Sequence, residues 1–160
     1  MKKIIFLFLI FSVVVFAKWE VGTDYTTGGD YPVTTFITYD DTNEAYVGIG
    51  VNVDGTGFSV VTIHISYKIK KEDDLVLIIT DNEGNNINCH FHSDDLEDYY
   101  IKVPSRRSTV LTKMLYNGQS AILKNTDTDE ILATFDLRGI KEIMQKHVGS
   151  SYWYKYKLND

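Results

Sequence analysis

The chain has little cysteine, little proline and no excess of positive charge. It contains one Cys and 2 Pro among 160 residues, and 22 Asp and Glu outnumber 16 Lys and Arg. A lone Cys cannot form an intramolecular disulfide, which excludes a disulfide-stabilised scaffold. A formal net charge of -6 argues against binding to nucleic acid, because phosphates attract basic surfaces. The 44% of hydrophobic residues is enough for a packed core and argues against global disorder.

The first seventeen residues, MKKIIFLFLIFSVVVFA, have the pattern of a secretory signal peptide. Two lysines follow the initial Met, and the apolar run over residues 4–16 is shorter than the roughly 20 residues of a membrane-spanning helix. Small residues precede the expected cleavage point after Ala17. We therefore predict export, with a retained N-terminal membrane anchor as the alternative.

Cleavage after Ala17 would leave 143 residues, 18–160. It would also remove two lysines, so the formal net charge would change from -6 to about -8. The remainder contains no second apolar run long enough to span a bilayer, so no membrane span is expected after removal of the signal. The predicted location is periplasmic or secreted.

Alternation of apolar and polar residues predicts one β-rich domain over residues 18–160. Helical spacing appears only in the last third, where Ser108 and Asp136 are candidate N-caps for two short helices. The predicted fold class is mainly β (α+β): an antiparallel β-sandwich-like domain with two short helices in the C-terminal third. Residues 149–160 alternate and are predicted to be an edge strand or a tail. Strands are expected at 33–39, 45–53, 61–70, 75–80, 87–92, 99–103, 119–124 and 130–135, and helices at 108–117 and 137–147.

Alternation also assigns side chains to the two faces of each predicted strand. In 45–53, Val47, Ile49, Val51 and Val53 share the face assigned to the core, which places Tyr46, Gly48 and Gly50 on the opposite face. His64 lies on the polar face of the 61–70 strand.

Three histidines form a candidate metal site. His90 and His92 are two residues apart on a predicted strand, so both imidazoles lie on one face, and His64 joins them if the two strands are neighbours. The ion would be zinc or copper, whereas solvent-facing histidines without a cofactor are the alternative. Cys89 lies on the opposite face of its strand, which favours a buried thiol over a metal ligand or a nucleophile.

Aromatic and cationic residues mark a second candidate surface. Tyr25 and Tyr31 flank a Gly-Gly-Asp loop, and Trp153 lies in a Tyr-rich C-terminal segment. Tyr and Trp provide large amphipathic contact areas, so these residues are candidates for a recognition surface or for covers over the ends of the sheet. Arg106 and Arg107 form a pair in an acidic protein and would either hold a carboxylate of a ligand or form an exposed structural pair.

Two segments carry a resemblance to a known family. The opening Lys18-Trp19-Glu20-Val21 and the C-terminal order of LTKMLYNG, a hairpin and Phe135-Asp136-Leu137-Arg138-Gly139-Ile140 are similar to small exported bacterial proteins. These are the proteins of the invasion-associated locus B type and the periplasmic proteins associated with type VI secretion. The resemblance implies a β-sandwich-like fold and an exported, non-enzymatic accessory or interaction protein.

The leading functional hypothesis is therefore a binding or interaction protein of the bacterial envelope. It would contact another protein or an envelope component, such as a glycan, through an exposed sheet face or through its aromatic loops. One alternative is a metal-binding protein or metal-dependent hydrolase that uses His64, His90 and His92. Another is an inhibitor of a basic enzyme, because an acidic surface steers a protein toward a basic target.

Overall fold

The computed structural model describes residues 18–25, 32–52 and 59–149 of the chain. Every pair of neighbouring strands in this part is antiparallel, and the strands form two sheets. The predicted mainly β fold with two short helices is thus confirmed. Among the described residues, no helix has the length and apolar character needed to cross a membrane.

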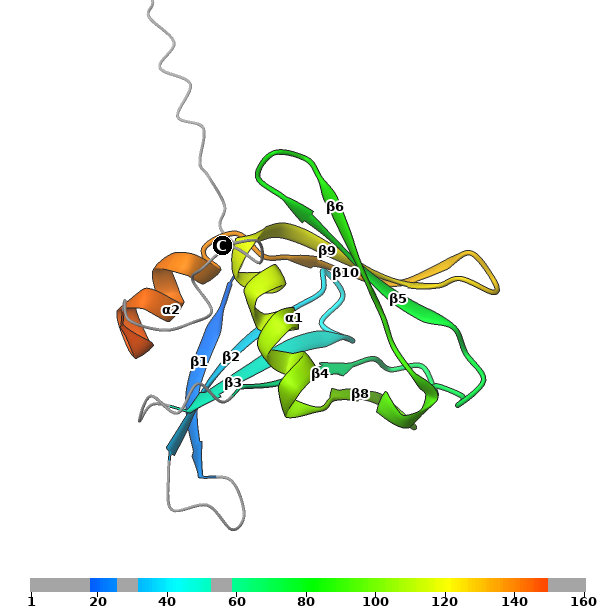
Figure 1. Ribbon diagram of the computed structural model, residues 1–160, viewed down its shortest axis with the longest axis horizontal. Helices are drawn as coiled ribbons and strands as arrows, with labels where there is room; N and C mark the ends of the chain where they lie inside the picture. Colours follow the sequence, from blue (N-terminus) through cyan, green and yellow to red (C-terminus); the bar gives the residue numbers. More distant parts are fainter. Residues whose placement is uncertain (1–17, 26–31, 53–58, 150–160) are drawn as a thin grey trace, which may run out of the picture.

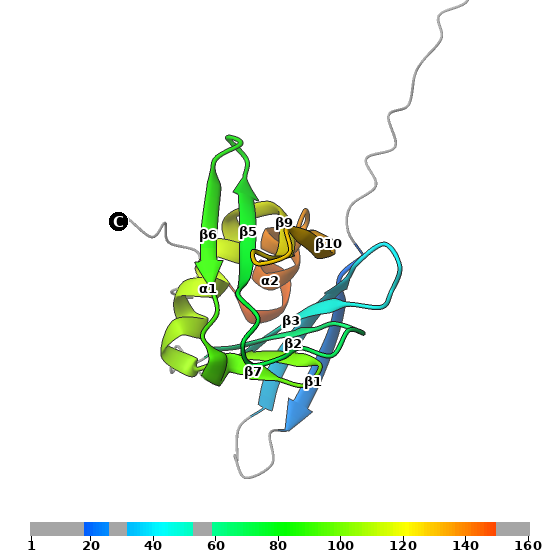
Figure 2. The ribbon, with the colours of Figure 1, turned by 90° about the vertical axis from the view of Figure 1, so that its right-hand side faces the viewer.

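The first sheet has six strands and the second has four (Figures 1 and 2). Their spatial orders are β1-β2-β3-β4-β8-β7 and β10-β9-β5-β6. The bounds in the first sheet are β1 Glu20–Tyr25, β2 Pro32–Tyr39, β3 Tyr46–Asn52, β4 Ser59–His64, β7 Leu96–Glu97 and β8 Tyr100–Val103. Those in the second are β5 Leu75–Asp81, β6 Asn86–His90, β9 Gly118–Asn125 and β10 Glu130–Asp136. The helices are the 3-10 turn η1 Ser93–Asp95, α1 Ser105–Asn117 and α2 Ile140–Val148.

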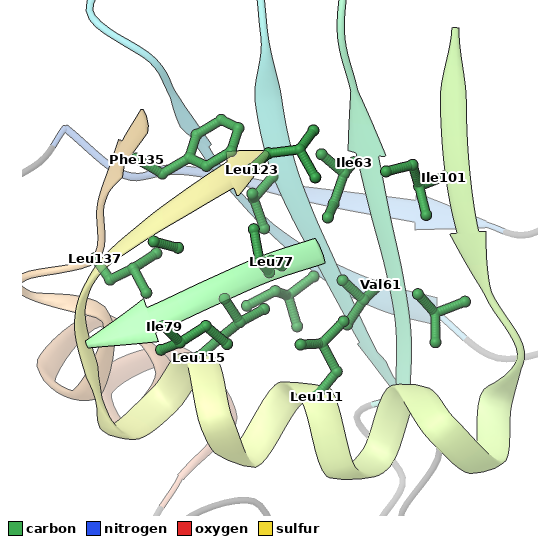
Figure 3. Close-up of a cluster of buried hydrophobic side chains, with 14 of the residues drawn as sticks. Val61, Ile63, Leu77, Ile79, Ile101, Leu111, Leu115, Leu123, Phe135 and Leu137 are labelled. Atoms are coloured by element: carbon green, nitrogen blue, oxygen red, sulfur yellow. The ribbon is translucent and has the colours of Figure 1, made fainter. Parts of the chain in front are cut away.

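The two sheets pack face to face over one hydrophobic core, and their strands cross in clearly different directions (Figure 3). Helix α1 lies along one side of the core and points Leu111 and Leu115 between the sheets (Figure 3). Burial of each such aliphatic side chain stabilises the fold by roughly 1.5–3 kcal/mol. The fully buried members include Phe36, Ile49, Ile63 and Ile101 of the first sheet and Leu77, Ile79, Leu123 and Phe135 of the second.

Buried hydroxyl groups fasten α1 to the first sheet. The Ser108 hydroxyl accepts a hydrogen bond from the Val61 backbone N–H at 3.0 Å and donates one to the Val103 carbonyl at 2.7 Å. The hydroxyls of Ser59 and Thr112 lie 3.1 Å apart and are also buried. Because these polar atoms satisfy one another away from water, they fix the position of the helix at little desolvation cost.

The two sheets also meet at a corner where β2 ends. Asp40 and Phe135 form an isolated antiparallel bridge, and the Thr38 hydroxyl donates to the Asp136 carbonyl at 3.4 Å. The Trp19 indole donates to the Arg138 carbonyl at 3.2 Å, which ties the start of the first sheet to the segment before α2.

The structure corrects three element boundaries. The strand predicted over 61–70 ends at His64, because the chain then turns inward and buries Ile65 and Ile69 while Tyr67 stays 40% exposed. Helix α1 begins at Ser105 with Pro104 at its N-cap, so Ser108 is an internal residue.

The second helix begins later than predicted, at Ile140 instead of Leu137. Its N-cap is Gly139, whose φ of 87° is a left-handed conformation that glycine adopts without strain. The carboxylate of Asp136 instead accepts hydrogen bonds from the backbone and guanidinium of Arg138. The turn predicted at 54–57 and the predicted edge strand or tail from Ser150 onward lie outside the described residues.

Candidate functional site

Four rings form a row across the outer face of the six-stranded sheet. We call this row the aromatic ladder: Tyr39 on β2, Tyr46 on β3, His64 on β4 and Tyr100 on β8. Backbone register aligns them, since Tyr39 is paired with Tyr46, Tyr46 with His64, and His64 with Tyr100. Four neighbouring strands therefore present one ring each at the same level.

The rings contact one another along the whole row. The centroids of Tyr46 and His64 lie 5.1 Å apart with the planes only 13° from parallel. Tyr39 meets Tyr46 edge to face at 5.9 Å, and Tyr100 meets the other side of His64 at 4.9 Å with a tilt of 58°. Cross-strand aromatic pairs of this kind stabilise a structure by about 0.5–1.5 kcal/mol beyond the area they bury.

A tight turn aligns the first two rings. Asp40 follows Tyr39, and its carboxylate accepts hydrogen bonds from the backbone N–H groups of Glu44 and Ala45, both at 3.0 Å, and from the Thr42 hydroxyl at 2.6 Å. Burial raises the pKa of Asp40, but these hydrogen bonds outweigh burial and lower its pKa below the ordinary value. The ionised aspartate thus closes the β2–β3 turn and places Tyr39 opposite Tyr46.

A glycine leaves room beside the ladder. Gly48 follows Tyr46 on the same face of β3, and a Cβ atom added to Gly48 would lie 3.7 Å from a carbon of the Tyr46 ring. The Tyr46 ring therefore covers part of the backbone at Gly48, where a strand would otherwise expose its main chain. Gly48 belongs to a second row of residues beside the ladder, which continues with Thr62 on β4 and Lys102 on β8.

A lysine and a glutamate lie beside Tyr100, at the β8 end of the ladder. The Lys102 ammonium lies 5.9 Å from the centroid of the Tyr100 ring and forms an ion pair with Glu97. The hydrogen bond from Lys102 to Glu97 raises the pKa of the lysine. At the centre of the row, burial raises the pKa of Tyr46, and the neighbouring Tyr100 and Tyr39 raise it further. The central tyrosine is therefore neutral over the physiological pH range.

The ladder faces away from the rest of the described fold. The four-stranded sheet, α1 and α2 all lie on the opposite, inner side of the six-stranded sheet (Figure 2). Tyr100 is 36% exposed, and Tyr39, Tyr46 and His64 are half-buried by one another. A solvent-facing sheet surface ordinarily carries polar side chains, so four adjoining rings distinguish this face.

The structure does not bring the three predicted metal ligands together. His64 lies in the six-stranded sheet, whereas His90 ends β6 at the edge of the four-stranded sheet and His92 precedes η1. Within the described ranges, no group of three or more His, Cys, Asp and Glu side chains is arranged to hold a metal ion. The condition for a zinc or copper site, that the histidine strands be neighbours, is not met.

The two arginines have different surroundings. Arg107 forms an ion pair with the buried carboxylate of Asp95 and donates a second hydrogen bond to the His90 carbonyl at 2.9 Å. It therefore connects α1, η1 and β6. Arg106 is exposed. Cys89 faces the core, as predicted, but it is half-buried rather than buried; burial raises the pKa of its thiol, which opposes a role as a nucleophile.

Of the remaining predicted surface residues, the structure describes the backbone of Tyr25. Tyr25 ends β1, where its backbone is paired with Pro32. Its side chain, Tyr31 and Trp153 lie outside the described residues.

Sequence reasoning placed two ladder residues correctly but did not join them. Tyr46 was assigned to the outer face of its strand and His64 to the polar face of the next, and both assignments are confirmed. Tyr39 and Tyr100 were missed as members of the site. The available signal was the spacing of seven positions between Tyr39 and Tyr46 around an Asp-rich turn, which predicts a hairpin with opposed tyrosines.

The protein is thus mainly β, and its distinctive surface is the aromatic ladder. Comparison of the chain with protein-family models, with curated proteins and with solved structures finds no match.

Proposed function

We propose that the protein is an exported, non-enzymatic binding protein that recognises a partner protein through the aromatic ladder. The observation that carries the proposal is the in-register row of Tyr39, Tyr46, His64 and Tyr100 on a sheet face that no other described element covers. Tyrosine supplies a large contact area with little loss of side-chain entropy, and it is enriched among the residues that dominate binding energy.

The ring geometry favours a protein partner over a glycan. A sugar ring would stack on an exposed aromatic face, but His64 is stacked on Tyr46 and is also contacted by Tyr100 at a tilt of 58°. One face of Tyr46 is covered by His64, and Tyr39 contacts it on the other side. The row therefore offers ring edges and hydroxyl groups, which suit the mixed apolar and hydrogen-bonding surface of a folded protein.

The end of the ladder has the composition of an interface rim. Lys102 and Glu97 form an exposed ion pair beside Tyr100. Exposed pairs contribute little energy, but charges at a rim orient the partner and exclude like-charged competitors. We expect the tyrosines to supply affinity and this pair to supply specificity.

Export is the second part of the proposal. It is supported by the signal-peptide pattern of residues 1–17 and by the resemblance to exported bacterial proteins. N-terminal sequencing of protein recovered outside the cytoplasm should read Lys18-Trp19-Glu20. A sequence beginning at Met1 would contradict cleavage.

Site-specific photo-crosslinking in the producing cell tests the binding surface. A photoreactive amino acid is placed at Tyr100, and a matched one at Thr134, which is exposed on β10 in the other sheet. We expect one discrete protein adduct from position 100 and none from position 134. The adduct should be lost when His64 is replaced by Ala, because the ring that orders Tyr46 and Tyr100 is then absent.

Two results would contradict the proposal. Equal adducts from positions 100 and 134 would indicate contact without a specific surface. Retention on insoluble envelope polysaccharide that depends on Tyr100, with no protein adduct, would identify a glycan as the ligand.

A further inference from the structure

The two ends of the aromatic ladder differ in how their charged groups are paired. At the Tyr100 end, both acids of the β7–β8 hairpin have a lysine partner. Lys102 forms an ion pair with Glu97, and the Lys68 ammonium lies 3.4 Å from a carboxylate oxygen of Asp98. Opposite charges this close cancel much of each other's field, so the Tyr100 end is nearly neutral.

The Tyr39 end carries carboxylates without such partners. The β2–β3 turn, residues 40–45, joins Tyr39 directly to Tyr46. Its Asp41 and Glu44 are both exposed, and none of the ion pairs of the described residues involves either of them. Two free negative charges therefore border the first pair of rings.

Cationic side chains on two neighbouring segments already have acid partners. Lys18, just before β1, lies 3.9 Å from Glu20, and Arg138, shortly after β10, forms an ion pair with Asp136. Cleavage after Ala17 would add one α-amino group at residue 18, whereas the turn contains three carboxylates. The Tyr39 end therefore keeps an excess of negative charge.

Aromatic rings beside free carboxylates suit a guanidinium group. This planar cation binds carboxylate oxygens through a fork of N–H donors, and it also packs against aromatic side chains. We propose that the partner of the ladder is a basic protein whose arginine-bearing surface lies against Asp41 and Glu44 while its apolar side chains contact the rings. The inference rests on the proposed function, since it names the chemistry of the partner that the ladder would bind.

The charge difference between the two ends would also orient the partner. An acidic surface attracts a basic protein over a longer range than ring contacts do, and unequal charge along the row favours one of the two directions in which the partner can lie. We therefore expect the cationic side chains at the Tyr39 end and a near-neutral contact at the Tyr100 end.

The β5–β6 turn provides a matched control. Its Asp81 carboxylate accepts hydrogen bonds from the backbone N–H groups of Glu83 and Asn85, both at 2.8 Å, much as Asp40 closes the β2–β3 turn. Glu83 is exposed and is likewise in none of the ion pairs of the described residues. The tip of this hairpin projects away from the six-stranded sheet (Figure 2). Glu83 therefore separates a local effect from an effect of net charge.

Photo-crosslinking from position 100 in the producing cell tests the partner's charge, with the protein expressed at a low level so that the adduct yield follows affinity. Replacing Asp41 by Asn together with Glu44 by Gln should lower the yield. Replacing both by Lys should lower it by at least about tenfold, because like charges then face each other. Glu83→Lys should leave the yield unchanged.

Two further measurements accompany the yields. Circular dichroism of the purified variants should show an unchanged fold, because the turn is closed by backbone N–H groups that donate to Asp40, which is not replaced. Mass spectrometry of the wild-type adduct should place the cross-link in a partner segment that contains Arg or Lys.

The outcomes distinguish this inference from the proposed function. An adduct whose yield is unchanged or increased in both double variants would overturn the basic partner and leave a binding role for the ladder. An equal loss from Glu83→Lys would overturn the local contact at the Tyr39 end. An adduct with a second copy of this chain would also overturn the inference, since that copy carries the same carboxylates. Absence of any protein adduct from the wild type would contradict the proposed function itself.

Discussion

The outer faces of the two sheets carry rows of different side chains. On the six-stranded sheet, one row consists of four rings that stack on one another. On the four-stranded sheet, the equivalent central row is Asn88, Ile78, Ile122 and Thr134, with aliphatic side chains in the middle and polar ones at both edges.

The difference teaches where each sheet can be recognised. In the row on the four-stranded sheet, the branched side chains at the centre pack on their neighbours across the strands. At its edge, β6 contains no proline and no charged residue, and the Arg107 guanidinium bonds the His90 carbonyl there. The six-stranded sheet has an aromatic outer face. Aromatic side chains therefore distinguish the outer face of the six-stranded sheet from that of the four-stranded sheet.

The largest expected effect compares a crowded glycine with an open one. A Cβ atom at Gly118, where β9 begins, would lie 2.7 Å from Leu137 Cδ1 and 2.8 Å from Ile79 Cγ2. Gly118→Ala should therefore destabilise the protein by about 1–3 kcal/mol through overpacking. Gly48→Ala, on the outer face of the six-stranded sheet, meets no atom closer than 3.7 Å and should be neutral or slightly stabilising. Urea unfolding measures both, and equal losses would contradict the open surface beside the ladder.

A smaller effect separates the two outer faces directly. Double-mutant cycles with alanine at Tyr46 and His64 should give a coupling of about 0.5–1.5 kcal/mol, because the stacked rings interact beyond their buried area. The same cycle at Ile78 and Ile122, which are directly opposed on β5 and β9, should give a smaller coupling within about 0.2–1 kcal/mol. A larger coupling in the isoleucine pair would remove the energetic distinction between the faces.

The smallest effect is a pH dependence confined to the aromatic face. The pKa of Tyr46 is raised, so the folded protein keeps the Tyr46 proton at a pH where the unfolded chain releases it. Its contribution is present below the ordinary tyrosine pKa of about 10 and is lost as pH rises toward the folded pKa. The stability of wild type relative to Tyr46→Phe should therefore decline above about pH 10, as measured by urea unfolding. Ile78→Val should show no such change relative to wild type, and a flat Tyr46→Phe difference would contradict the assignment.

Local patterns were sufficient for most of the fold. Strand positions, the burial of Val47, Ile49 and Val51, and the inward side of Cys89 all follow from strict alternation within single strands. The strand predicted over 61–70 was too long. Ile65, Tyr67 and Ile69 keep the alternation of a strand although the backbone has already turned after His64. Alternation reports burial, and a buried loop residue satisfies it as well as a strand residue does.

Candidate sites were harder, because proximity across strands is not written in one segment. His64 and His90 each lie on an outward face, as predicted, yet they belong to different sheets. His64 instead contacts Tyr100, which lies 36 residues further along the chain. Tyr100 reaches His64 only because β8 returns to pair with β4. The Asp40 turn places Tyr39 opposite Tyr46 in the first half of the ladder. In the second half, α1 packs against β4, the strand that carries His64.

The sequence by itself determined the strand content, the inward and outward side chains of each strand, and the acidic, low-cysteine character of the chain, because these depend on composition and on a period of two. Only the tertiary structure decided which strands are neighbours, which four rings meet in one row, and that Arg107 bonds the His90 carbonyl at the end of β6. Those properties depend on register, and register is set when two faces bury a common core. No single segment contains that information.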